Sequence, residues 1–155
     1  MIHRESYYED LRDYLRCLEE KSLLIRVARQ INKDTELMPL IRWQFRGLPE
    51  EKRKAFWFDN VIDVKGRKYN MPVVAGAHAS STEIYALAMN TRPEQINDKW
   101  THAMNNPIPS QLVKDGPVHE VVEQGADLHK EGHGLEQFPI PISLPGFDPG
   151  PFLTA

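Results

Sequence analysis

The sequence lacks several features that would assign it to a particular class of protein. Cys17 is the only cysteine in 155 residues, which excludes an internal disulfide framework and favours a reducing cytoplasm. No apolar run is long enough to span a bilayer, and the N-terminus has no signal-peptide hydrophobic region. The formal charge of -3, without any Lys/Arg cluster, argues against nucleic acid as a partner. These absences leave an ordinary soluble globular protein.

Motifs of familiar chemistry are also missing. The nine glycines form neither G-x-G-x-x-G nor a P-loop, and no serine lies in a nucleophile elbow. His129 and His133 have the spacing of a helical metal pair, but glycines within and beside that interval favour an exposed loop. Cys17 has no basic group arranged to ionise it, so we interpret it as a structural thiol. His78 has no visible partner. The residues alone predict neither a catalytic set nor a metal site.

The part of the chain before Pro107 has the periodicity of alternating helices and strands. Helices are expected to begin at three capping boxes, residues 6–9, 80–83 and 91–94. A further helix is expected along the apolar stripe of residues 39–47, which ends in a glycine. Strands are expected where β-branched and aromatic residues cluster, at residues 23–29, 55–61 and 71–76, with a turn at 65–67. We therefore predict an α/β (α+β) domain over residues 1–106.

Two runs of apolar residues are expected to form the core of this domain. Leu11, Tyr14, Leu15 and Leu18 follow each other at helical spacing and make one stripe. The consecutive aromatic residues 56–58 indicate a strand that is covered on both faces, which is far more often core than a ligand stack.

The composition changes at Pro107, which is the first of eight prolines among the last 49 residues, out of twelve in the chain. Residues 111–114 and 117–123 alternate between apolar and polar about Asp115-Gly116, which predicts a strand, a turn and a second strand. The closing stretch, residues 138–155, holds five prolines and cannot be helical. Pro139 and Pro141 favour extended backbone, and residues 152–154 have the pattern of a strand that is just beginning. We predict a second domain over residues 107–155.

These stretches together resemble the N-terminal portion of the UbiD family of decarboxylases. The resemblance rests on the order DLRDYLRCLEEKSLLIRV, FWFDNV, MPVVAG, LVKDGPVHEVV and FPIPISLPGFDPGPFLTA, and covers the chain from about Tyr8 to Ala155. It implies an α/β N-terminal domain followed by the start of a split β-barrel like that of flavin reductases. It also implies an oligomeric, cytoplasmic enzyme that uses prenylated FMN, manganese and often potassium.

The resemblance implies few site residues in this chain. The family's metal ligands and its Glu-Arg-Glu catalytic set lie beyond the strand expected at residue 152, so no catalytic residue and no metal ligand is carried over. Thr154 and Ala155 alone match the strand edge beside the family's cofactor, and we expect them to be cofactor neighbours. The chain by itself is therefore expected to bind no flavin and to show no decarboxylase activity.

Two hypotheses follow from this partial resemblance. The first is an N-terminal fragment or split subunit of a carboxy-lyase that acts on aromatic, heteroaromatic or α,β-unsaturated acids together with the remaining enzyme portion or a partner subunit. The second is a non-catalytic interaction subunit that keeps the fold and serves a partner chain. Reading the frame beyond Ala155 would separate them. The strand expected at 152–154 and the apolar residues before it predict pairing with a second chain, or a segment that is disordered or folded back.

Overall fold

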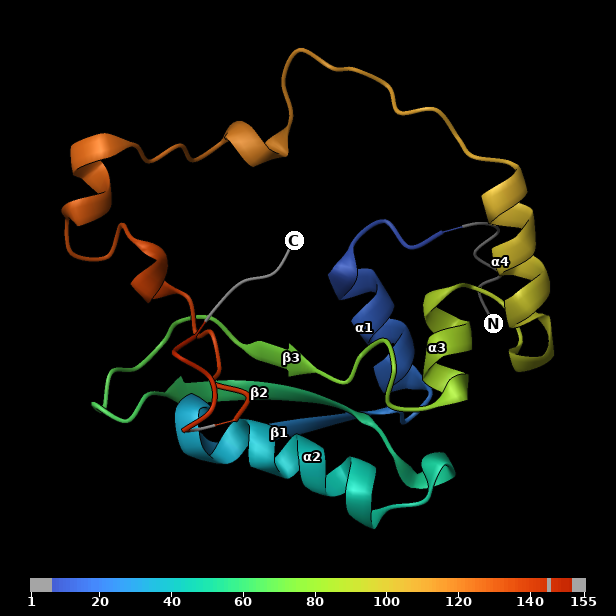
Figure 1. The fold of residues 1–155 in the computed structure, drawn as a ribbon, viewed down its shortest axis with the longest axis horizontal. Coiled ribbons are helices and arrows are strands. Elements are labelled where there is room, and N and C mark those ends of the chain that lie inside the picture. Colours follow the sequence, from blue (N-terminus) through green and yellow to red (C-terminus); the bar gives the residue numbers. More distant parts are fainter. Residues whose placement is uncertain (1–6, 145, 152–155) are drawn as a thin grey trace.

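The structure, a computed structural model, describes residues 7–144 and 146–151 and forms a three-stranded sheet with helices on both faces (Figure 1). The helices and strands follow each other as α1 (Leu11–Glu20), β1 (Leu24–Asn32), α2 (Met38–Gly47), β2 (Ala55–Ile62), β3 (Val73–Ala75), α3 (Thr82–Ala88) and α4 (Ile96–Asn105). The mixed α/β class predicted from the sequence is confirmed. None of the helices in the described part of the chain has the length and apolarity to cross a membrane.

The sheet has the order β1-β2-β3, with one parallel and one antiparallel pairing. β1 pairs with β2 in parallel, Ile25 opposite Phe56, and α2 provides the crossover between them. β2 pairs with β3 antiparallel, Trp57 opposite Val74. The connection between them turns at Gly66, whose φ of +79° suits glycine. The three predicted strands and this turn are therefore confirmed.

Two hydrophobic clusters lie on opposite faces of the sheet because side chains alternate along β2. Ala55 packs with α1 and α3 in a cluster that Trp57 joins from the same face. Phe56 and Phe58 point the other way, stack on each other, and pack with Leu37 and α2. The predicted burial of the aromatic run on both faces is confirmed.

The predicted helix starts need correction, since other polar residues cap the helices. Asp10 caps α1 by accepting a hydrogen bond from the Asp13 N–H at 2.7 Å, so the box at residues 6–9 is not the cap; Ser6 lies outside the described residues. Ser81, not Ser80, caps α3 through the Ile84 N–H. α4 begins after a 3-10 turn at Pro93–Gln95 rather than at Thr91.

The predicted apolar stripe of the first helix is only partly correct. Tyr14, Leu15 and Leu18 are buried, as expected, but Leu11 is 53% exposed. Leu11 is the first residue of α1, where the helix projects beyond the sheet that covers the next turns (Figure 1).

The strands predicted at residues 111–114 and 117–123 are wrong. The described residues after α4 contain no strand, and the only regular elements there are 3-10 turns such as Pro117–His119. Residues 107–133 are almost all exposed and arch away from α4 before the chain returns to the sheet (Figure 1). An alternating pattern makes a strand only when a neighbouring strand accepts its hydrogen bonds, and none lies beside this segment in the described part.

Candidate functional site

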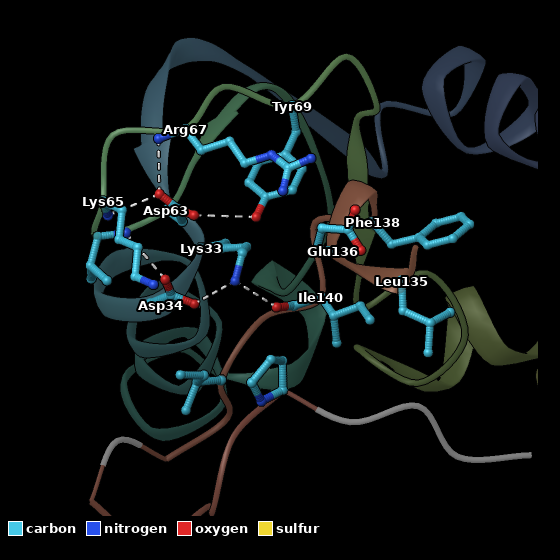
Figure 2. A pocket seen from close by; sticks show the side chains of 13 residues that line it. Lys33, Asp34, Asp63, Lys65, Arg67, Tyr69, Leu135, Glu136, Phe138 and Ile140 are labelled. Atoms are coloured by element: carbon cyan, nitrogen blue, oxygen red, sulfur yellow. Dashed lines mark hydrogen bonds and ion pairs between the residues drawn. The ribbon is translucent and has the colours of Figure 1, made fainter. Parts of the chain in front are cut away.

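A cavity of about 740 Å³ lies where the returning segment meets the domain (Figure 2). Its walls come from the helical turn just before α2, from the loop between β2 and β3, and from the segment after residue 134. The lining residues are Lys33, Asp34, Asp63, Val64, Lys65, Arg67, Tyr69, Leu135, Glu136, Phe138, Ile140, Ile142 and Pro151. One wall is therefore charged and the other apolar.

The charged wall is built on a buried ion pair between neighbouring residues. Lys33 Nζ lies 2.6 Å from Asp34 Oδ1, and the two side chains are only 7% and 9% exposed. Both residues belong to a π-helical turn, Lys33–Leu37, whose first N–H groups are capped by the Asn32 side chain. The turn aims both side chains into the cavity (Figure 2).

The loop between β2 and β3 forms the next part of the wall and is organised by Asp63. The Asp63 carboxylate accepts hydrogen bonds from the N–H groups of Lys65 and Arg67, each at 2.9 Å, and from the Tyr69 hydroxyl at 3.4 Å. Partial burial alone would raise the pKa of Asp63, but these hydrogen bonds outweigh it and lower the pKa. Partial burial, together with the nearby Asp63 charge, raises the pKa of Tyr69.

The apolar wall is the proline-rich segment of residues 138–142. Pro139 is buried and Ile140 and Ile142 are half-buried. The Ile140 carbonyl accepts a hydrogen bond from Lys33 Nζ at 2.9 Å, and the Ser143 carbonyl accepts one from the Arg42 guanidinium. This part of the closing stretch is therefore folded back on the domain, one of the three outcomes expected from the sequence.

The arrangement can bind and orient chain segments, but its groups are mostly satisfied by each other. Asp34 is shared between Lys33 and the Val64 N–H at 3.2 Å. Glu136 accepts hydrogen bonds from backbone N–H groups, its own among them, which lower its pKa. Across the described ranges, no three His, Cys, Asp or Glu side chains come together in a way that could hold a metal ion. These residues do not fit a manganese site, and we derive no chemical step through one.

Among the residues singled out from the sequence, Cys17 and His78 do not line this cavity. Thr154 and Ala155 fall outside the described residues. Cys17 is half-buried on α1, where the Tyr8 hydroxyl lies 3.6 Å from its sulfur. His78 is exposed and stacks on Tyr14 with ring centroids 5.6 Å apart.

The histidine pair lies on a loop, as the sequence predicts. His129 ends a 3-10 turn at Gly125–His129, and His133 Nδ1 lies 2.9 Å from Glu123 Oε1. The contacts of Lys33 and Arg42 with the closing stretch were not predicted because their partners lie 107 and 101 residues away along the chain.

Comparison with solved structures shows which proteins this chain is similar to. No family model matches the chain. Among solved structures, the UbiD-class enzyme HmfF from Pelotomaculum thermopropionicum in complex with FMN is 33% identical with a TM-score of 0.68, and the match covers 94% of this chain and 29% of that chain. An evolved dimeric form of the same enzyme in complex with prFMN is 29% identical with a TM-score of 0.62, covering 94% and 30% of the two chains.

A weaker likeness extends to vanillic acid decarboxylase from Sedimentibacter hydroxybenzoicus. It is 25% identical over 64% of this chain and 20% of that chain, with a TM-score of 0.49, too low to support an argument. The two HmfF matches confirm the resemblance to the N-terminal portion of the UbiD family. This chain spans less than a third of the length of those enzymes.

Proposed function

We propose a function for this chain because it matches the N-terminal portion of the UbiD-class enzymes in fold and sequence. It is the N-terminal fragment or split subunit of a prenylated-FMN-dependent (de)carboxylase that acts on aromatic, heteroaromatic or α,β-unsaturated acids. The observation that carries the proposal is the 33% identity at a TM-score of 0.68 over 94% of the chain. Two UbiD-class neighbours bound to FMN and prFMN support the flavin.

The proposed role of this chain is to carry the proline-rich segment to the cofactor domain. The α/β part buries its own two clusters, whereas the segment from Pro107 leaves large apolar side chains exposed, among them Ile108, Leu112 and Val118 at 94%, 99% and 83%. Exposed apolar side chains in such number are usually covered by another part of an assembly. We propose that the remaining enzyme portion covers them and completes a split β-barrel with a domain boundary near Pro107.

The flavin and its metal are proposed to be held mainly outside this chain. Thr154 and Ala155 are the proposed cofactor neighbours here, and manganese and potassium would bind to the remaining enzyme portion. When bound, the prenylated flavin supplies the covalent capture of the unsaturated acid from which carbon dioxide is lost. The described residues contribute positioning.

The test is to sequence the gene past codon 155 and to express the complete product, or this chain with the product of the adjacent frame. After reconstitution with prenylated FMN, MnCl₂ and KCl, we expect flavin to stay bound through gel filtration and a panel of aromatic and unsaturated acids to release carbon dioxide. The 155-residue chain is the control and should do neither.

Two outcomes would overturn the proposal. Complete product that retains no flavin and decarboxylates none of the acids would contradict it. A stop codon, together with a stable flavin-free complex with another chain, would favour the non-catalytic interaction subunit instead.

A further inference from the structure

The returning segment is held to the domain through its backbone rather than through its side chains alone. Two carbonyl groups, those of Ile140 and Ser143, accept hydrogen bonds from Lys33 and Arg42. Both cationic side chains come from the continuous helical stretch 33–47. The segment therefore lies along that stretch and is fixed to it at two points.

The sequence of the segment explains why side-chain donors are needed. Pro139 and Pro141 have no N–H, so this backbone cannot form the ladder of a central sheet strand. Its carbonyl groups still need donors when they leave water, because a buried carbonyl without a hydrogen bond destabilises the fold. Lys33 and Arg42 supply those donors, and both carry a charge that strengthens the hydrogen bond.

The orientation of the Lys33 side chain is fixed by its neighbour Asp34. Its ammonium is fixed by the buried Asp34 carboxylate at 2.6 Å, and the second oxygen of Asp34 accepts the Val64 N–H. One pair of charges thus joins the π-helical turn, the loop after β2 and the returning segment (Figure 2). A buried ion pair adds little net stability, and its best-attested use is to fix one register among several.

We propose that Lys33, Asp34 and Arg42 form a carbonyl clamp that sets the register of residues 139–143. The clamp is a positioning device, not catalytic machinery. In the complete enzyme, and resting on the proposed function, it fixes the point from which the chain continues toward Thr154 and Ala155 beside the flavin. A slip of the segment by one residue would move the half-buried Ile140 and Ile142 side chains out of their present contacts.

The first test uses the 155-residue chain and amide hydrogen exchange measured by NMR. The Ile140 and Leu144 amides donate hydrogen bonds to the Phe138 carbonyl and the Asp148 carboxylate, at 2.8 and 2.6 Å. In Lys33→Met and Arg42→Met these two amides should exchange about 10-fold faster, while the Phe58 amide in β2 should change less than about two-fold. Lys65→Met is the matched control, since Lys65 lines the same cavity but is not part of the clamp. Unchanged exchange at residues 140 and 144 would overturn the proposal.

A second variant separates the clamp from the cost of an unpaired buried carboxylate. Lys33→Met leaves Asp34 without its cation, so the cost of an unpaired buried carboxylate is added to the loss of the hydrogen bond to Ile140. The double variant Lys33→Met/Asp34→Asn removes both charges and keeps an oxygen for the Val64 N–H. Faster exchange at residues 140 and 144 in the double variant supports the clamp. A return to the wild-type rate would show that only the buried charge matters, and would refute the clamp.

The last test concerns the complete enzyme. There, Arg42→Met and the double variant should raise the dissociation constant for prenylated FMN several-fold, and substitution of Arg42 by lysine should restore part of the loss. An unchanged dissociation constant despite a loosened segment would refute the link to the cofactor. If the complete product binds no flavin at all, the proposed function fails, while the exchange measurements on the chain still decide the clamp.

Discussion

The burial of apolar side chains differs between the region up to residue 106 and the region of residues 107–133. In the first region Leu18 and Phe58 are 0% exposed, and in the second Leu112 and Ile108 are 99% and 94% exposed. The first region has strands that pair with each other and helices that cover both faces of the sheet (Figure 1). The difference shows that apolar residues alone do not make a core. They need elements whose periods bring them to a common face.

Hydrogen exchange should show the largest contrast between the two regions. Amides in the middle of β2 open through unfolding of the domain, which for typical proteins costs 5 kcal/mol or more, so they should exchange about 10⁴-fold more slowly than intrinsic rates. Amides at residues 107–133, outside any strand, should exchange near intrinsic rates. Uniform protection across both regions in a monomer would show that the second region folds on its own.

A matched pair of truncations should give the next largest contrast. Phe58→Ala removes a fully buried ring at the centre of the cluster with α2, and should lower the free energy of unfolding by about 3–5 kcal/mol. Leu112→Ala should change it by less than about 0.5 kcal/mol. Urea unfolding followed by circular dichroism measures both. A large loss in Leu112→Ala would mean that the arching segment packs in solution.

Buried polar groups should show the same contrast on a smaller scale. The Gln44 side chain, 1% exposed, accepts the Lys54 N–H at 2.7 Å and donates to the Lys54 carbonyl at 2.9 Å. Gln44→Ala leaves both backbone groups unpaired and should cost about 1–3 kcal/mol. Gln124→Ala in the second region is the control, expected within about 0.5 kcal/mol. Equal effects in the two variants would contradict this account of the α2 packing.

The smallest expected effect is a pH dependence of the loop after β2. Partial burial alone would raise the pKa of Asp63, but hydrogen bonds from Arg67 and Lys65 lower it overall. The stability that the ionised Asp63 carboxylate gives to the folded loop is therefore fully present above the ordinary Asp pKa of about 3.9. It is lost as pH falls through the lowered pKa of the folded state. Amide shifts of Lys65 and Arg67 should follow this titration and should not do so in Asp63→Asn. A midpoint at or above the ordinary value would refute it.

Local pattern was sufficient where an element's burial depends on its own period. The predicted burial of residues 56–58 and the three predicted strands were correct. Both depend on the pattern of consecutive residues, which either alternate between apolar and polar or are apolar throughout. Helix starts were less reliable. Ser80 and Ser81 are both good caps by type, but the Ser80 hydroxyl accepts a hydrogen bond from Gln44 Nε2 at 3.4 Å and Ser81 is the cap.

The sequence by itself determined the α/β class, the strands of the sheet and the resemblance to the N-terminal portion of the UbiD family, because each depends on residues close together in the chain. Only the tertiary structure decided that residues 111–123 are not strands and that Lys33 and Arg42 hold the carbonyls of Ile140 and Ser143. Both depend on which distant segment lies alongside. No periodicity, spacing or motif in the sequence predicts a hydrogen bond between residues that are 107 positions apart.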